Sequence, residues 1–381
     1  MNQAGVIKLS PSVLEWAAGQ AGATLHEVAS KVSARRYELI EQGQLTPTQA
    51  EKFARIVNVP FGYLFFTEPP VQRPLPIADL RTVQDREPLG QEFFETYDDI
   101  VYKQEWFVDY LTRVGAEPLP FVGSFEGTRE QIPAIAADMR QKLGLTSEIL
   151  RAAKNKDELF SLIAERVEAA GILVFKNGVV GNNTRRGLPV AQFRGFAIVD
   201  PLAPAVFVNG ADAKAAWVFT LLHEVAHIWI GESGVSDAAP GSSAITEVVC
   251  NAVAAEILVP LGEFIPRWSA LESLPVPARI EALRRDFKVS GLVIARRALD
   301  QGLISLELYR EIYAAARKAG TESSGGDFYR TLGARNGKRF ARTVADLAYA
   351  GDIGLRQAGR LLNTTPSNVL NYRDRIRALP A

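Results

Sequence analysis

The chain has 381 residues, 47% of them hydrophobic, and its 43 lysines and arginines balance 43 aspartates and glutamates. This length and hydrophobic content allow two or three domains with buried cores, and the zero net charge excludes a global electrostatic preference for nucleic acid or another charged partner. The single cysteine excludes a disulfide scaffold and fits a reducing compartment.

In chain order, the N-terminus lacks the apolar core of a signal peptide. No apolar run approaches the roughly 18 residues that a membrane span needs. From these two features we expect a cytoplasmic protein with no membrane partner.

Residues 8–68 carry the signals of a compact all-helical domain. Three helix starts are marked by a capping residue followed by a proline, or by a glutamate three positions later. These starts are Ser10-Pro11, Thr24 with Glu27, and Thr46-Pro47. His26 is expected to be a solvated residue of the second helix, and a third helix is expected over residues 33–41.

Short helices, a tight turn and a third helix that carries Arg35 and Arg36 indicate a helix-turn-helix. The order of apolar, cap and glycine positions over residues 25–60 resembles the XRE/Cro-type helix-turn-helix family. That resemblance implies DNA binding, with Arg35 and Arg36 as the candidate contacts. The domain is charge-balanced, whereas DNA binding needs cations that neutralise phosphates. A protein-interaction module on the same helical scaffold is therefore the alternative.

A Pro-rich stretch, residues 69–88, predicts a linker, and a change of pattern after it predicts helices followed by a small sheet. The first of these helices carries an aromatic stripe suited to a core or a docking face. The expected helices are 90–114, 127–143 and 155–170, and the expected strands are 172–175, 192–199 and 205–209.

The next helix contains an H-E-x-x-H motif, formed by His223, Glu224 and His227. Two histidines four residues apart share one helix face and can bind one metal ion, while Glu224 reaches a water on that ion. Apolar flanks indicate a buried helix, and Gly231 is the expected stop. A chance pair of surface histidines is the weaker interpretation, because the flanks do not fit an exposed helix.

A catalytic zinc site needs a third protein ligand and an open position for water. No histidine follows the motif, which leaves carboxylates and the single cysteine. The candidates are Glu232, Asp237, Glu247, Glu256 and Cys250. Glu232 and Asp237 lie in a Gly/Ser/Pro-rich loop, a poor platform for a rigid ligand, and a lone buried cysteine is more often core. Glu247 opens a second helical stretch and shares a face with Asn251, so it is the chosen ligand, with Glu256 as the outside candidate.

Three stretches around this motif resemble the ImmA/IrrE family of metallopeptidases: 207–209, 219–227 and the spaced residues of 247–260. The resemblance implies an α+β fold with a zincin-like zinc peptidase domain over residues 89–319. It makes His223, His227 and Glu247 the Zn²⁺ ligands and Glu224 the catalytic residue. The helical N-terminal domain and the linker resemble longer members that carry both domains in one chain.

The family resemblance also implies partners. It indicates a protein substrate, an XRE-type transcriptional repressor, cleaved in a stress or mobile-element response. The alternative is a DNA-binding regulator or an antitoxin that uses the zinc domain for sensing or to bind a cognate toxin. Residues 193–196 are either a sheet edge that pairs with substrate backbone or an ordinary internal strand. Arg194 is the candidate for a second oxyanion donor.

The C-terminal third is expected to be helical. Residues 261–319 are amphipathic and suit a lid or support for the peptidase, and residues 320–326 predict a flexible linker. The tail, residues 327–381, is basic. Its segment 355–376 has the rhythm of a second helix-turn-helix, although a basic helical hairpin that binds a partner protein fits as well. The residues able to face a DNA groove are Ser367, Asn368, Asn371 and Arg375.

Overall fold

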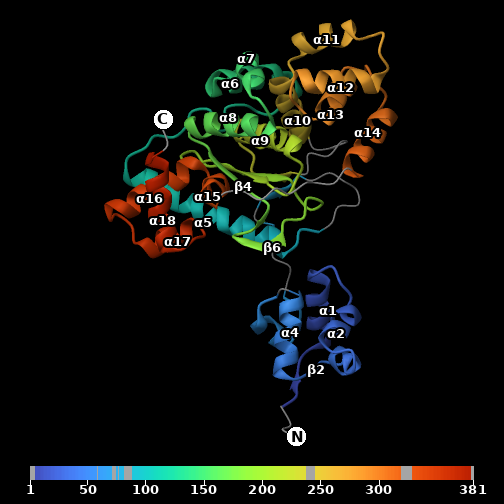
Figure 1. The fold of residues 1–381 in the computed structure, drawn as a ribbon, viewed down its shortest axis with the longest axis vertical. Coiled ribbons are helices and arrows are strands. Elements are labelled where there is room, and N and C mark those ends of the chain that lie inside the picture. The colour runs from blue at the N-terminus through green and yellow to red at the C-terminus, as the bar shows by residue number, and fades with distance from the viewer. Residues whose placement is uncertain are drawn as a thin grey trace. The chain divides into compact units, whose positions relative to one another are not determined.

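A computed structural model describes residues 5–57, 59–70, 74–75, 77–80, 88–236, 245–318 and 328–378. Side chains are described for these residues except 316–318, 328–331 and 376–378. The chain forms two compact units, Met1–Pro76 and Ile77–Ala381 (Figure 1). Within the described ranges no single helix is long and apolar enough to cross a membrane.

The first unit is helical. Its elements are β1 (Ile7–Lys8), α1 (Pro11–Gln20), α2 (Leu25–Val32), α3 (Tyr37–Glu41), β2 (Gln44–Leu45), α4 (Pro47–Val57) and the 3₁₀ helix η1 (Phe61–Phe65). The predicted capping box is confirmed, because Thr24 Oγ1 accepts from Glu27 N at 3.2 Å and Glu27 Oε2 accepts from Thr24 N at 2.9 Å. The helices pack around a core that contains the fully buried Leu14, Val28 and Phe53.

The third helix of this unit is shorter than predicted. Ser33 takes extended backbone angles that end α2, and Arg36 N donates to Ser33 O at 3.2 Å in the following turn. The expectation that Arg35 and Arg36 lie on a helix is therefore wrong, since both are exposed in the turn before α3. His26 is exposed on α2, as expected, and its Nδ1 lies 2.8 Å from Glu41 Oε1.

The second unit is built on a mixed five-stranded sheet, which gives the predicted α+β fold. The strand order is β3 (Ala78–Asp79), β9 (Gly234–Ser236), β7 (Gly195–Ile198), β8 (Ala205–Asn209) and β4 (Leu173–Asn177). Strand β7 is antiparallel to both of its neighbours, whereas β4 with β8 and β3 with β9 are parallel pairs. A hairpin of β5 (Val179–Val180) and β6 (Asn183–Gly187) follows β4.

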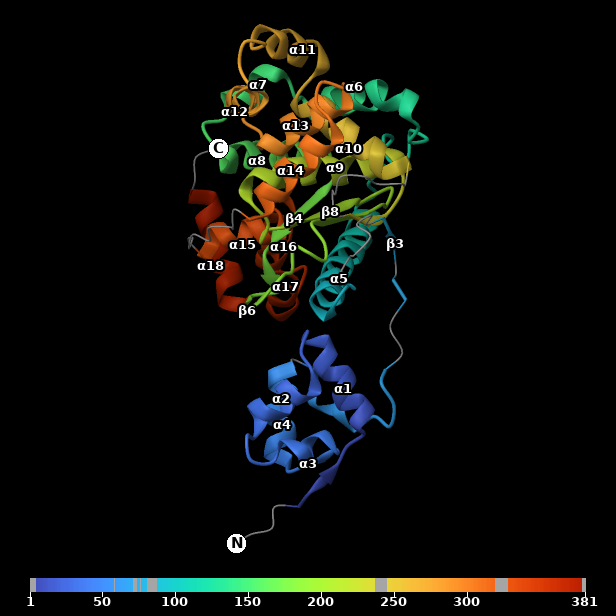
Figure 2. The same cartoon turned by 90° about the vertical axis from the view of Figure 1, so that its right-hand side faces the viewer.

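Strand β7 lies inside the sheet, so the interpretation of residues 193–196 as a substrate-binding edge is wrong. The chain after the motif helix returns to the sheet as β9 and pairs with the outer side of β7. The described edge on that side is β3, whose two residues come from the segment predicted as a linker (Figure 2). Leu80 N extends the pairing by donating to Val235 O at 3.1 Å.

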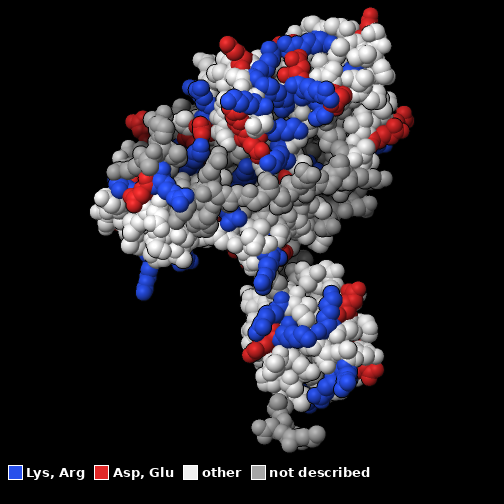
Figure 3. Space-filling model, viewed as in Figure 1, with Lys and Arg blue, Asp and Glu red and all other residues white. Residues whose placement is uncertain are grey.

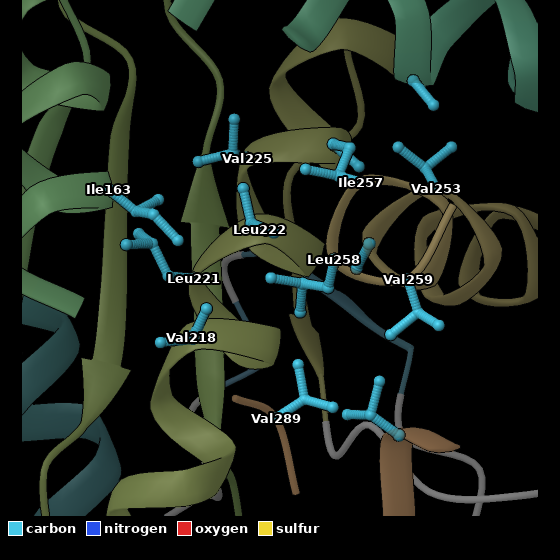
Figure 4. Packing of buried hydrophobic residues seen from close by; sticks show 14 of the residues in the cluster. Ile163, Val218, Leu221, Leu222, Val225, Val253, Ile257, Leu258, Val259 and Val289 are labelled. Carbon is cyan, nitrogen blue, oxygen red and sulfur yellow. The ribbon is translucent and has the colours of Figure 1, made fainter. Parts of the chain in front are cut away.

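This unit also contains helices, of which α8 and α9 pack on the sheet. They are α5 (Gln91–Arg113), η2 (Arg129–Gln131), α6 (Ile132–Leu143), α7 (Ser147–Ala152), α8 (Lys156–Ala169), α9 (Lys214–Ile230), α10 (Ile245–Leu258), α11 (Leu261–Ala270), α12 (Val276–Asp286), α13 (Gly291–Asp300) and α14 (Leu306–Lys318). Helix α9 packs against α10, α8, β7 and β8. Figure 4 shows Leu221, Leu222 and Val225 of α9 among Ile257 and Leu258 of α10. Burial from several sides explains why most residues of α9 outside the motif are apolar.

The tail forms four helices, and α15 and α16 pack on the sheet and on α8 (Figures 1 and 2). They are α15 (Phe328–Asn336), α16 (Lys338–Ala350), α17 (Leu355–Leu361) and α18 (Pro366–Ala378). Phe340 is fully buried, and its ring lies 5.8 Å from those of Trp106 and Phe107 on α5 and 5.7 Å from that of Phe175 on β4. The linker predicted at 320–326 lies outside the described residues.

Candidate metal centre

Three side chains from α9 and α10 converge. His223 Nε2 and His227 Nε2 lie 3.2 Å apart, and the oxygens of Glu247 lie 3.0 Å from His227 Nε2 and 3.3 Å from His223 Nε2. Zinc–nitrogen bonds of about 2.0–2.1 Å in a tetrahedron place neighbouring ligand atoms about 3.3 Å apart. The spacing therefore fits one zinc ion, and all three residues are buried.

The end of α9 is held firmly, which keeps the motif in place. Gly231 has a φ of +84° and donates from its N–H to His227 O at 2.8 Å, so the helix stops where the sequence predicted. Trp229 Nε1 donates to Asp138 Oδ2 at 2.7 Å, and its ring stacks 4.3 Å from that of Phe121. These contacts fix the last turn, which carries His227.

A hydrogen bond from α10 orients one histidine. His223 Nδ1 lies 3.1 Å from Asn251 Oδ1. With Nε2 directed at a metal, Nδ1 carries the hydrogen and donates to the amide oxygen, which sets the tautomer and the ring orientation. Asn251 is one helical turn after Glu247, so a single face of α10 supplies both a ligand and the partner of another ligand.

Glu224 is fully buried, and neither carboxylate oxygen has a hydrogen-bond partner among the described residues. Space for this carboxylate depends on a glycine in β7. A Cβ on Gly195 would lie 2.5 Å from Glu224 Oε1 and 2.9 Å from Thr220 Cγ2. A buried carboxylate without donors has a large desolvation cost unless a cation or its water lies beside it. This side chain therefore fits a metal site rather than a plain core.

Without a bound cation, burial and the neighbouring charged groups shift the pKa values of the four side chains of the site. Burial raises the pKa of Glu224 to about 8. Burial alone lowers the pKa of a histidine, but the charge and hydrogen bond of Glu247 outweigh it at His223 and raise that pKa to about 9. At His227 burial prevails and the pKa falls. Burial opposes ionisation of Glu247, but the two histidines lower its pKa despite it. Binding of a metal requires both imidazoles to be neutral, so it releases a proton from the site.

The other candidate ligands lie elsewhere. Glu256 forms an ion pair with Arg297, and Glu232 Oε2 accepts from Thr246 Oγ1 at 2.8 Å. Cys250 is a buried free thiol whose pKa is raised by burial, and it packs in the core. Asp237 lies outside the described residues. Among the described side chains, the group able to hold a metal is His223, His227 and Glu247.

Arg194, the candidate oxyanion donor, has its guanidinium occupied. Its Nη1 lies 3.2 Å from Asp212 Oδ2, and its backbone N–H donates to Ser236 O at 3.2 Å. The sequence indicated no role at the metal site for Gly195 or Ser236, and it placed Asn251 beside Glu247 without assigning it a function. The helix face shared by Asn251 and Glu247 was a signal that could have identified Asn251. No sequence signal marked the two strand residues, Gly195 and Ser236.

Comparisons with known proteins agree with this geometry. Residues 167–299 match the peptidase M78 family, described as an IrrE N-terminal-like domain, and residues 336–375 match a domain of unknown function, DUF8813. No curated protein matched the chain. The first match contains the motif and Glu247. The chain therefore contains an IrrE-like metallopeptidase domain with a zinc site of the H-E-x-x-H and glutamate type.

Proposed function

We propose that this protein is a zinc-dependent endopeptidase that cleaves another protein, and that its helical N-terminal unit recognises DNA or the target. The observation that carries the proposal is the convergence of His223, His227 and Glu247 in a metallopeptidase domain, with the unpartnered carboxylate of Glu224 beside them. A purely structural metal site has no need of that carboxylate.

Each residue has a defined task in the proposed reaction. His223 and His227 through Nε2, and Glu247 through its carboxylate, would hold the zinc ion. Bound zinc supplies Lewis acidity and makes a water nucleophilic at neutral pH. A carboxylate oxygen of Glu224 accepts the proton of that water and returns it to the nitrogen of the leaving amine.

The proposed substrate is a transcriptional repressor of the XRE type, and the support is the resemblance of most of the chain to two-domain ImmA/IrrE proteins. In this proposal residues 8–68 are a helix-turn-helix domain, 69–88 a linker, 89–319 the peptidase domain and 327–381 a basic helical domain. Arg35 and Arg36 are exposed and are the proposed DNA contacts. Figure 3 shows both charge signs on the first unit, so protein recognition by the same unit is the other form of the proposal.

A second candidate is a transcriptional regulator or antitoxin that uses the zinc domain to bind a partner such as a toxin. The burial of the site favours it, because His223, Glu224, His227 and Glu247 are each at most 1% exposed. A protein substrate has to reach these groups before it can be cleaved.

Glu224→Gln distinguishes the two candidates. The amide keeps the size of the side chain but accepts no proton, so zinc and fold should survive while cleavage is lost. Affinity capture with Glu224→Gln should then retain an uncut partner that the wild-type protein cleaves, and the variant should behave as a deletion in cells. Glu232→Gln, an exposed glutamate just after α9, is the matched control and should resemble the wild type. Normal regulation or toxin neutralisation by Glu224→Gln would support the second candidate instead.

A further inference from the structure

Ser236 has a buried hydroxyl that the sheet does not use. It is the last residue of β9, and its side chain is buried, with 1% of the residue exposed. Its backbone is already paired, because it lies opposite Gly195 in β7 and its carbonyl oxygen accepts from Arg194 N at 3.2 Å. A small apolar side chain would serve the strand equally well, so the hydroxyl needs another explanation.

The hydroxyl lies against the metal centre. Ser236 Oγ donates to Glu247 Oε1 at 3.2 Å and lies 3.4 Å from His227 Nε2. Neither oxygen of Glu224 forms a hydrogen bond within the described residues. The hydroxyl on β9 therefore faces one ligand from α9 and one ligand from α10.

Metal binding would leave this hydroxyl one hydrogen-bond acceptor, Glu247 Oε1. The lone pair of His227 Nε2 is needed by the ion, so Ser236 retains Glu247 Oε1 as its acceptor. The two oxygens of Glu247 face different histidines, Oε1 at 3.0 Å from His227 Nε2 and Oε2 at 3.3 Å from His223 Nε2. A hydrogen bond to one oxygen restricts rotation of the carboxylate and so determines how the group is presented to a metal.

We propose that Ser236 is a positioning residue of the zinc site, whose hydroxyl holds the Glu247 carboxylate in its ligating orientation and thereby raises zinc affinity. The proposal rests on the zinc site of the proposed function. Loss of a hydrogen-bond partner behind a metal ligand typically weakens metal binding by about 10- to 100-fold. We expect a change of that size for Ser236→Ala.

The test measures zinc affinity of the full chain by competition with a chromophoric chelator, and the visible absorption of the protein loaded with Co²⁺. Ser236→Ala should bind zinc about 10- to 100-fold more weakly and should change the cobalt spectrum, which reports on ligand geometry. Ser236→Thr keeps the hydroxyl and should restore both. Ser233→Ala is the matched control, because the Ser233 hydroxyl accepts from Val199 N at 2.9 Å and takes no part in the metal group.

Wild-type zinc affinity and an unchanged cobalt spectrum in Ser236→Ala would overturn the proposal. So would a loss that a folded Ser236→Thr protein fails to restore, or an equal loss in Ser233→Ala, because the hydroxyl of Ser236 would then not be the cause. If Ser236→Ala does not fold, Ser236→Gly also removes the hydroxyl and adds no metal-binding atom, and a weaker affinity is again expected. Failure of the wild-type chain to bind zinc at all would instead contradict the proposed function.

Discussion

Two buried glutamates in the second unit have raised pKa values, and burial is the main cause for both. Their surroundings, however, differ. Glu224 of α9 has a pKa of about 8 and no hydrogen-bond partner among the described residues. Glu168 of α8 has a pKa of about 7, and its Oε1 accepts from Arg339 N at 3.1 Å. Glu168 therefore joins the tail to the peptidase part through a hydrogen bond, whereas Glu224 has no such bond among the described residues. The comparison shows that a perturbed pKa identifies a reactive group only when its partners are also known.

The largest expected difference between the two glutamates is in catalysis. Glu224→Gln should lower the rate of peptide-bond cleavage by about 10²- to 10⁴-fold, the usual size of a general acid–base contribution. Glu168→Gln should leave the rate near that of the wild type, because its carboxylate lies at the α8–α16 contact. Cleavage of the captured partner by each variant at equal zinc content is the measurement. Equal rates for the two variants would contradict the proposal that Glu224 acts in catalysis and Glu168 does not.

Replacement of the third ligand tests the environment of Glu224. Glu247→Ala should lose most of the zinc found in the wild type, because two histidines alone form a weak site. Glu256→Ala is the control at the other end of α10 and should keep zinc, since Glu256 pairs with Arg297. Metal content after exhaustive dialysis measures both. Zinc retained by Glu247→Ala and lost by Glu256→Ala would contradict the ligand assignment.

A pH titration tests the joining role of Glu168. Its pKa is raised from 4.5 to about 7 in the folded protein, so the folded state keeps a proton that the unfolded state loses. This contribution to stability is present below pH 4.5 and is lost as pH rises through 7, with a total of about 3 kcal/mol. Glu168→Gln should remove that dependence while retaining an acceptor for Arg339 N. Thermal unfolding between pH 5 and 8 measures it, and parallel curves for variant and wild type would refute it.

The smallest expected effect concerns DNA. If the first unit binds DNA, replacement of both Arg35 and Arg36 by Ala should weaken binding. The slope of log affinity against log salt should fall by about one unit for each phosphate that the two side chains no longer neutralise. Binding at several salt concentrations is the measurement. Unchanged affinity, with weaker binding on replacing Arg356 and Arg375 of the tail, would instead place DNA binding on the exposed side chains of α17 and α18.

The tail illustrates how basic composition can mislead. The sequence predicted helices and a positive charge, and the helices are present. Several of its arginines are used within the chain: Arg373 lies 3.4 Å above the ring of Tyr349, Arg360 4.5 Å above that of Tyr102, and Arg339 5.6 Å above that of Phe107. Composition counts such residues as available to a partner, whereas packing has already engaged them.

The spacing of residues along the sequence was enough to predict the metal-binding group, the fold class and the long helix α5. The four-residue interval of the two histidines and the carboxylate that opens α10 follow from helix geometry, and both appear in the fold as expected. The α+β class and the long helix α5 follow from periodicity in the same way. The ligand and base roles, the domain limits and DNA binding stay predictions for the experiments above.

Tertiary structure alone decided the surroundings of the site. Whether β7 lies inside the sheet depends on β9, which is separated from it by the whole of α9. The space that Gly195 leaves for Glu224 and the hydrogen bond from Ser236 to Glu247 join segments that have no common period in the sequence. Helical and strand periodicities report which face of an element is buried, and they carry no information about which distant element covers that face. The motif was therefore readable from the sequence, and the side chains that position it were not.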